Sequence, residues 1–350
     1  MGVTEQVSEL DPATLSETDA AALASVANAA QAVDAPHLDP VDAAHVRRRH
    51  QYGWDMHPTH RLLVTYAGDV LAGYAEIGIS HWDNPDLAFI DLEVHPEHRG
   101  RGLGRSLVRC VDEAIRLDGR PRVLADGWLD SPRQAFWERR GFTLGMVAAQ
   151  RRLLVADLDR ADLDRADLDR AGLDRAGLDD LLAQTETASS DYELVDLPNP
   201  AQPDLVPDLL AVHTAINDAP LDDLVLEDDA WPAERVRAYE QAMTARCFRL
   251  HRLLAKRRSD GAPAGQTVIV VDGDRPWIAS QEDTAVVAAH RGHKLGLRLK
   301  IAMLRLLAHR EPQVRYIDTW NAESNRHMLA VNDALGCFVV GRSAELQRPG

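Results

Sequence analysis

The chain has 350 residues, a formal net charge of −16 at pH 7 and a hydrophobic fraction of 45%. This length predicts two domains rather than a single core, and the acidic balance argues against nucleic acid and acidic membrane surfaces as partners. Three cysteines without pairing or metal-ligand spacing predict a reduced, cytoplasmic protein that holds no metal. The polar N-terminus does not have the pattern of a secretory signal, and no apolar run has the length of a membrane span.

The first half of the chain alternates helical and strand patterns, which is typical of an α/β protein. Helices are expected at 18–30, 41–51, 103–115 and 131–140, and strands at 61–66, 70–79, 87–94, 122–129 and 142–149. Residues 1–10 show neither pattern and are expected to be loose.

A basic, glycine-rich turn joins the strand at 87–94 to the helix that follows it. The turn reads Val94-His95-Pro96-Glu97-His98-Arg99-Gly100-Arg101-Gly102-Leu103-Gly104. A helix N-terminus favours an anion because its first N–H groups are unpaired and its dipole is positive there. The glycines let the backbone take conformations that other residues avoid. The turn therefore predicts a site for a phosphorylated ligand.

Residues 156–188 form a low-complexity segment in which the pentad Ala-Asp-Leu-Asp-Arg repeats and drifts. The pentads resemble those of pentapeptide-repeat β-helices, but the run is barely longer than one coil of that fold. In a helix, the leucines would rotate around the axis and form no apolar stripe. We therefore expect a solvated, partly helical linker between an N-terminal module at 1–155 and a C-terminal module at 189–350.

The order of elements starts again after residue 192. Helices are expected at 204–216, 233–245, 296–309 and 325–335, and strands at 248–255, 266–271, 283–287, 314–320 and 338–340. A second turn, Val286-Val287-Ala288-Ala289-His290-Arg291-Gly292-His293-Lys294-Leu295-Gly296, again joins a strand to a helix. An internal duplication explains this repetition better than chance does.

Other glycine-rich loops do not fit the first turn. The spacing Gly100-x-Gly102-x-Gly104 differs from the dinucleotide fingerprint and lacks its acidic partner downstream. A Walker loop would require Gly-Lys followed by Ser or Thr, which is absent. A purely structural turn remains the alternative for both segments.

Both turns resemble the cofactor loop of the GNAT N-acetyltransferases, whose pattern is Q/R-x-x-G-x-G/A between a strand and a helix. Arg99, Gly102 and Gly104 match this pattern fully. In the second turn Arg291 and Gly296 match, while Lys294 replaces the middle glycine. The tandem arrangement resembles that of mycothiol synthase and related actinobacterial proteins. The resemblance implies two tandem GNAT folds, each a splayed mixed β-sheet with helices on both faces.

The same resemblance implies that acetyl-CoA is the co-substrate, with its pyrophosphate on the loop amides and its pantetheine arm beside the preceding strand. The residues that it assigns to the cofactor are Val94, Arg99, Gly100, Arg101, Gly102, Leu103, Gly104 and Arg105 in the first half, and Val286, Arg291, Gly292, His293, Lys294, Leu295, Gly296 and Asn325 in the second. An ordinary helix cap is the alternative role for Asn325.

Acetyl transfer also requires an acid that protonates the leaving thiol and a base that deprotonates the amine. Family members often use a tyrosine four residues before a Gly-Phe pair as the acid for the thiol, but Trp137 and Asn332 occupy these places. Neither side chain donates a proton as a phenol does. A carboxylate must also take the proton of the amine, and the candidate residues are Asp91, Glu93, Glu282 and Asp283. For each, the alternative is a solvent-facing carboxylate on an alternating strand.

These features predict an acetyl-CoA-dependent N-acetyltransferase that acts on the amine of a small molecule, as a monomer or homodimer. The alternative is an acyl-CoA-binding regulatory protein in which one or both modules are catalytically silent. In a third interpretation, the second module only builds the acceptor pocket.

Overall fold

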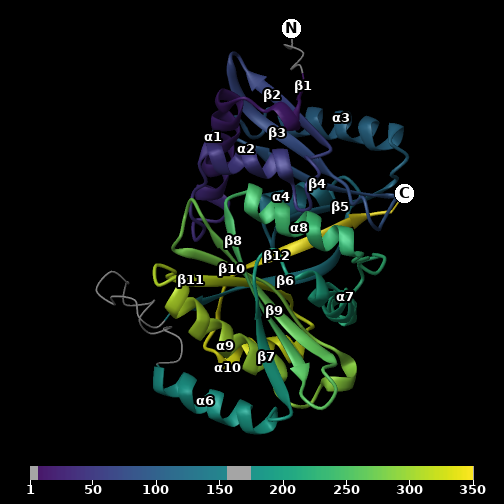
Figure 1. The fold of residues 1–350 in the computed structure, drawn as a ribbon. Coiled ribbons are helices and arrows are strands. Elements are labelled where there is room, and N and C mark those ends of the chain that lie inside the picture. The colour runs from purple at the N-terminus through teal and green to yellow at the C-terminus, as the bar shows by residue number, and fades with distance from the viewer. Residues whose placement is uncertain (1–6, 156–174, 350) are drawn as a thin grey trace. The chain divides into compact units, whose positions relative to one another are not determined.

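The computed structural model describes residues 7–155 and 175–349, which form two compact units (Figure 1). Unit 1 contains the described chain up to Val147, the segment Leu221–Glu227 and the residues from Gly341 onwards. Unit 2 contains the described residues of Ala148–Pro220 and Asp228–Val340. Among the helices that the structure describes, none has the length and the low polarity needed to cross a bilayer.

Unit 1 is built on a mixed sheet with the strand order β1-β2-β3-β4-β5-β12. The strands are β1 (Val7–Leu10), β2 (Arg61–Ala67), β3 (Val70–Gly78), β4 (Leu87–Val94), β5 (Arg122–Trp128) and the C-terminal part of β12 (Phe338–Arg348). Neighbouring strands are antiparallel except β4 and β5, which are parallel. The first strand lies where the sequence predicts a loose terminus.

Helices cover both faces of the unit 1 sheet (Figure 1). They are α1 (Glu17–Asp34), α2 (Ala43–Tyr52), α3 (Leu103–Leu117) and α4 (Pro132–Glu138). Leu62 and Val64 of β2 are buried in the core under α1 and α2. On the other face, Leu107 and Val111 of α3 pack with Ile90 of β4. The apolar spacing of α3 in the sequence thus reflects the single face that it buries.

The two parallel strands of unit 1 separate along their length. β4 and β5 pair only over Leu87–Ile90 and Arg122–Ala125. Beyond this point β4 continues along β3 to Val94, while β5 continues along β12. The strands therefore splay apart on the side where β4 leads into the glycine-rich turn.

Unit 2 has the strand order β6-β11-β10-β9-β8-β7. Its strands are β6 (Thr143–Leu154), which begins in unit 1, β7 (Tyr192–Leu197), β8 (Phe248–Arg257), β9 (Pro263–Asp272), β10 (Ile278–Val286) and β11 (Tyr316–Ala322). The parallel pair β10–β11 is joined only over Ile278–Gln281 and Tyr316–Thr319, which repeats the splay of unit 1.

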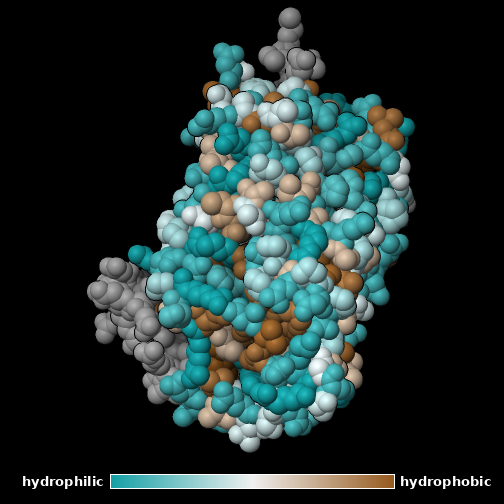
Figure 2. Space-filling view, in the orientation of Figure 1, coloured by the Kyte–Doolittle hydropathy of each residue, from teal (hydrophilic) through white to brown (hydrophobic). Residues whose placement is uncertain are grey.

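Helices also cover both faces of the unit 2 sheet. They are α6 (Arg175–Ala188), α7 (Val206–His213), α8 (Ala233–Ala245), α9 (Leu295–Arg310) and α10 (Arg326–Ala334). Leu299 and Met303 of α9 are buried in the core on one face. Leu209 of α7 and Val236 of α8 are buried on the other. Most of the surface shown in Figure 2 is hydrophilic, with apolar side chains gathered over β7 and β9.

The predicted linker falls in two parts. Residues 156–174 lie outside the described residues. The part from 175 to 188 is α6, and its Leu182 is buried with Ile301 and Leu335. This part is a packed helix of unit 2 instead of a solvated connection, because Leu182 finds an apolar site beside α9.

Two strands pass from one unit into the other. β6 leaves unit 1 after Val147, and its residues Ala148–Leu154 pair with β11 in unit 2. β12 enters unit 1 at Gly341, where Ser343–Arg348 pair with β5. The compact units therefore differ from the modules predicted at 1–155 and 189–350, because these two strands pair with partners that are remote in the sequence.

Candidate functional site

The first glycine-rich turn is a short loop that leads directly into a helix. A short 3₁₀ turn, η2 (Pro96–His98), follows β4. Gly100 and Gly102 then have φ angles of +76° and +100°, in the left-handed region that favours glycine. α3 begins at Leu103, and no described side chain caps its N-terminus. Its first backbone N–H groups are therefore available to an anion.

Arg99 fixes the shape of this loop. Its Nε donates to the Val94 carbonyl at 3.1 Å, and its Nη1 donates to Oδ1 of Asp34 at 2.9 Å. Asp34 is the last residue of α1. The guanidinium thus ties the end of β4 and the end of α1 to the start of the turn.

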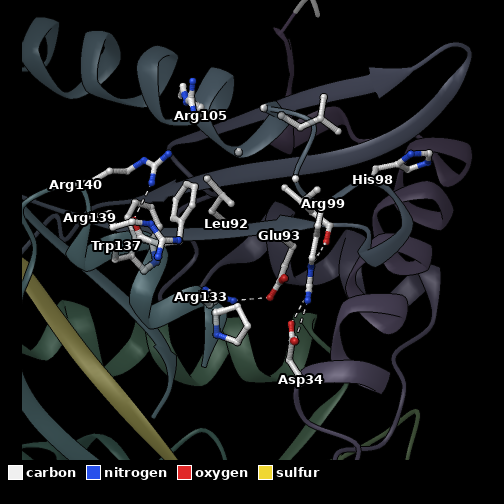
Figure 3. A pocket seen from close by; sticks show the side chains of 17 residues that line it. Asp34, Leu92, Glu93, His98, Arg99, Arg105, Arg133, Trp137, Arg139 and Arg140 are labelled. Atoms are coloured by element: carbon white, nitrogen blue, oxygen red, sulfur yellow. Dashed lines mark hydrogen bonds and ion pairs between the residues drawn. The ribbon is translucent and has the colours of Figure 1, made fainter. Parts of the chain in front are cut away.

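A cavity of about 670 Å³ lies between this turn and α4 (Figure 3). Its lining residues are Asp34, Leu92, Glu93, Val94, His98, Arg99, Gly100, Gly102, Leu103, Gly104, Arg105, Pro132, Arg133, Phe136, Trp137, Arg139 and Arg140. In Figure 3 the arginines of α3 and of the end of α4 gather on one side, and the carboxylates gather on the other. The cavity therefore has a basic end and an acidic end.

The basic end is formed by Arg105, Arg139 and Arg140. The guanidinium of Arg140 lies 3.4 Å above the ring of Phe136 and donates to the carbonyl of that residue. Burial lowers the pKa of Arg140, and the charges of Arg105 and Arg139 lower it further. This mutual repulsion shows that positive charge is concentrated beside the helix N-terminus, where a phosphate group would relieve it.

The acidic end is organised by Arg133, which lies at the start of α4. Its guanidinium pairs with Glu93 and with Asp91, the latter at 2.6 Å. It also lies 2.6 Å from Asp126 of β5. Arg49 of α2 reaches Asp91 from the other side, at 3.4 Å. Glu93 lines the cavity, whereas Asp91 is held behind it between two guanidiniums.

The two carboxylates of β4 titrate differently. Burial raises the pKa of Glu93 to about 7, and the charge of Asp91 adds to this effect although Arg133 opposes it. Burial also disfavours ionisation of Asp91, but Arg133 and Arg49 together hold its pKa below the usual value. Glu93 therefore has the proton affinity of a base that works near neutral pH, and Asp91 is an anchor for arginines.

The structure brings nearly all the first-half candidate residues to this cavity. Two of them do not line it: the exposed guanidinium of Arg101 donates to the Glu97 carbonyl, and Asp91 lies behind the cavity between Arg133 and Arg49. Asp34, Arg133 and the pair Arg139–Arg140 also line the cavity, although the sequence did not predict them. Arg139 and Arg140 form a basic pair directly before Gly141, which is a signal in the sequence. Asp34 and Arg133 have no such signal.

Trp137 lies at the place of the family's acidic tyrosine and lines the cavity. The side chain is fully buried against Phe136 and Phe142. Its indole Nε1 is buried and has no hydrogen-bond partner among the described residues. The position thus keeps a polar donor but offers no group that transfers a proton at neutral pH.

The second turn repeats the first in its backbone and in its arginine. Gly292 and Lys294 have φ angles of +88° and +53°. The Nε of Arg291 donates to the Val286 carbonyl at 3.1 Å, and its Nη2 pairs with Asp218. Lys294 therefore adopts a left-handed conformation that a glycine would take without strain.

The remaining candidate residues of the second half differ in burial and in contacts. Leu295 is buried and begins α9, with Gly296 directly after it. The ring of His293 packs 5.6 Å from that of Tyr192. Asn325 caps α10, because its Oδ1 accepts from the N–H of Met328 at 3.2 Å. This contact is the helix cap given as the alternative for Asn325, and its contact with the cofactor stays a prediction.

A buried amine lies beside Asn332, the unit 2 counterpart of Trp137. Nζ of Lys300 donates to Oδ1 of Asn332 at 2.7 Å, and Nδ2 of Asn332 donates to Oδ1 of Asn321. A void of about 20 Å³ adjoins Lys300 and Cys337. Burial lowers the pKa of Lys300 to about 8.

The lowered pKa of Lys300 predicts that the free energy of unfolding depends on pH. The folded pKa lies below that of the unfolded chain, so stability is reduced below pH 8 and recovers as the pH rises towards the unfolded value. We expect the free energy of unfolding to increase by ~1–3 kcal/mol between pH 7.5 and 10 through this group. Urea denaturation of Lys300→Met should lack that increase, whereas Lys294→Met, which removes an exposed amine, should keep it. Equal pH dependence in the two variants would contradict the assignment.

Glu282 and Asp283 form a β-bulge in β10. The register between β10 and β9 shifts between Gln281 and Thr284, so that both acidic residues face Val268. Burial raises the pKa of Asp283 to about 6 and that of Glu282 to about 8, to which Asp283 also contributes.

Comparison with known proteins gives a family match within the first unit. Residues 28–142 match the Acetyltransferase (GNAT) family. The chain is 42% identical over 59 residues to the mycothiol acetyltransferase of Salinispora tropica, a segment that covers 17% of this chain and 18% of that protein. It is 45% identical over 49 residues to the streptothricin acetyltransferase of Streptomyces lavendulae, which covers 14% of this chain and 25% of that protein. The matches therefore span a quarter or less of these curated relatives.

Solved structures show the fold of the whole chain. A tandem GNAT protein from the clavulanic acid biosynthesis pathway has a TM-score of 0.72 at 22% identity over 98% of both chains. A GCN5-related N-acetyltransferase from Sphaerobacter thermophilus has a TM-score of 0.66 at 18% identity, with coverage of 98% of this chain and 95% of that one. Residues 28–142 thus match the GNAT acetyltransferase family, and the chain as a whole has a tandem GNAT fold, as the sequence predicts.

Proposed function

We propose that the protein is an acetyl-CoA-dependent N-acetyltransferase, that the cavity of unit 1 is its active site and that a small-molecule amine is the acceptor. The observation that carries the proposal is the polarity of this cavity. Helix amides and three arginines lie at one end, and Glu93, with a pKa raised by burial to about 7, lies at the other. A phosphorylated donor and a protonated amine would bind to opposite ends of such a site. The reaction would take place in the cytoplasm, with neither nucleic acid nor a membrane as a partner.

The residues of the first turn fit coenzyme A. Gly102, Leu103 and Gly104 line the cavity at the start of α3, and their backbone amides would hold the diphosphate. Arg105, Arg139 and Arg140 supply the positive charge that phosphates require. When bound, acetyl-CoA supplies an acyl group activated as a thioester.

Glu93 performs the proton chemistry in this proposal. An amine attacks a thioester only in its neutral form, so its proton must leave first. The carboxylate of Glu93 takes that proton, directly or through one water molecule, and Arg133 keeps the carboxylate oriented towards the cavity. Trp137 replaces the tyrosine that would return a proton to the thiolate of coenzyme A. Solvent supplies that proton in this proposal.

The alternative function is acyl-CoA binding without catalysis. It is favoured by Trp137 and Asn332, which stand where many relatives have a tyrosine. Calorimetric titration with acetyl-CoA, followed by a free-thiol assay with a panel of amines, separates the two functions. Binding together with thiol release supports the enzyme, and binding without release on any amine supports the regulatory protein. If acetyl-CoA gives no heat, both fail.

The role of Glu93 predicts a specific pH profile. Because the base must be ionised, kcat should rise with pH through about 7 and then level off. Glu93→Gln should lower kcat by roughly 10²- to 10⁴-fold and remove this inflection. Asp91→Asn is the matched control. It should move the inflection to lower pH, since the charge of Asp91 helps to raise the pKa of Glu93. An unchanged inflection in Glu93→Gln would assign the proton transfer to another group.

A further inference from the structure

A short segment from the second half of the chain packs into unit 1. Leu221–Glu227, hereafter the strap, belongs to unit 1, although the residues on either side of it belong to unit 2. Its Leu224 is buried in a cluster with Leu87 of β4 and Leu124 of β5. One side chain of the strap therefore packs on both parallel strands of the unit 1 sheet.

Hydrogen bonds hold the backbone of the strap against the sheet. Nη1 of Arg122 on β5 donates to the Val225 carbonyl at 2.7 Å. Gln347 on β12 binds the strap twice, because its Oε1 accepts from the Val225 N–H at 3.0 Å and its Nε2 donates to the Asp223 carbonyl at 2.5 Å. Further partners of the strap are the Gly145 carbonyl of β6 and Asn84, which exchanges two bonds with Glu227. The strap is thus fixed to the sheet along its length.

The strap lies at the closed end of the splay between β4 and β5. These strands pair along the part that carries Leu87 and Leu124, and they separate beyond it. Alternate residues of a strand share a face, so Leu87 lies on the same face as Glu93, and Leu124 on the same face as Asp126. Arg133 bridges Glu93 and Asp126 where the strands have separated. One face of the splay therefore has the strap at its closed end and the Glu93 carboxylate at its open end.

The packing at the closed end determines how firmly the two strands are held where they separate. Leu224 fills the space between one residue of each strand, and truncating it would leave a cavity there. The strands would then shift relative to one another, and water would reach Glu93. We propose that the strap is a positioning element of the unit 1 site, in which Leu224 keeps Glu93 buried by holding the closed end of the splay. This role rests on the proposed function, since Glu93 is the base of that reaction.

The strap would act on Glu93 through packing and water access, not through charge. The ionisable groups that face Glu93 come from other elements: Asp34 of α1, Tyr74 of β3, Asp91 of β4, Arg99 of the turn and Arg133 of α4. Burial is the largest influence on the pKa of Glu93, so a change in water access should be visible in its titration.

The test is a titration of Glu93 in the full-length protein, followed by the carboxyl carbon-13 signal that disappears in Glu93→Gln. Wild type should titrate near pH 7, because burial raises this pKa. In Leu224→Ala the midpoint should fall by at least about 0.5 pH units, because access of water favours the ionised carboxylate. Val225→Ala is the matched control. It shortens an exposed side chain of the same strap and keeps the backbone bonds, so its midpoint should equal that of wild type.

Gln347→Met provides a second variant if Leu224→Ala does not fold. It removes both side-chain hydrogen bonds of Gln347 to the strap and leaves the apolar cluster in place. The midpoint of Glu93 should fall in this variant too. In the acetylation assay, the inflection of kcat against pH should move together with the midpoint.

The outcomes separate the role of the strap from the proposed function. A lower midpoint in Leu224→Ala with an unchanged midpoint in Val225→Ala supports the role, even if the free-thiol assay detects no acetylation of any amine. An unchanged or raised midpoint in Leu224→Ala overturns it, and so does an equal fall in Val225→Ala. If Leu224→Ala does not fold, an unchanged midpoint in Gln347→Met overturns it.

Discussion

Replacing Gly102 by valine should weaken acetyl-CoA binding roughly 10- to 100-fold, because a residue forced into that conformation costs about 1–3 kcal/mol. Gly102 has a φ of +100°, and a β-carbon there would meet no protein atom within 4 Å. The loss of acetyl-CoA affinity would therefore come from a changed turn conformation and from a side chain in the space of the ligand. It would not come from a clash within the fold. Isothermal calorimetry with acetyl-CoA measures the effect.

Gly119→Val is the matched control for this variant. Gly119 has a φ of +68° with no neighbour within 4 Å, and it lies at the other end of α3. It should share the conformational cost but bind acetyl-CoA normally. Gly292→Val tests the second turn, at a φ of +88°; Gly292 is the counterpart of Gly100, because Lys294 occupies the place of Gly102. If Gly102→Val binds like wild type while Gly292→Val does not, the second unit is the cofactor site.

Replacing Arg133 by methionine should destabilise the protein by about 3–5 kcal/mol, since removing one partner of a buried ion pair leaves charge uncompensated. Arg133 pairs with Asp91, Glu93 and Asp126 at once. In the variant these carboxylates repel one another, which raises their pKa values and makes protonation favourable. The deficit should therefore shrink as the pH falls from 8 to 5.

Guanidinium denaturation at several pH values measures this effect. Arg139→Met serves as the control, because Arg139 is exposed at the basic end of the same cavity. It should lower affinity for acetyl-CoA while leaving the unfolding free energy within about 0.5 kcal/mol of wild type. A pH-independent deficit in Arg133→Met would show that lost packing, and not lost charge, is responsible.

Much of the fold was visible in local patterns. The apolar spacing of Leu107 and Val111 predicted the buried face of α3, and strand-forming apolar runs predicted β2 to β5. The short edge strand β1 was missed because Val7–Leu10 has one partner strand and little apolar character. The early start of β10, at Ile278, and the bulge at Glu282 were also missed, since both depend on pairing with β9.

The candidate site was predictable only on its backbone side. The glycines and arginines of the turn predict an anion site, because these residues are close together in the sequence. Asp34 and Arg133 come from distant parts of the chain, and their roles depend on how α1 and α4 pack against β4. The distinction between Asp91 and Glu93 was equally out of reach, since one guanidinium from α2 and one from α4 decide it.

The exchange of strands has a consequence for the history of such a chain. The outer edge of β5 is covered by residues Ser343–Arg348, from the far end of the polypeptide. A free-standing ancestor of the first repeat would have needed a substitute strand there, since bare sheet edges recruit other chains. Gene fusion would have turned that contact between molecules into a contact within one chain. After fusion, neither half had to fold independently of the other.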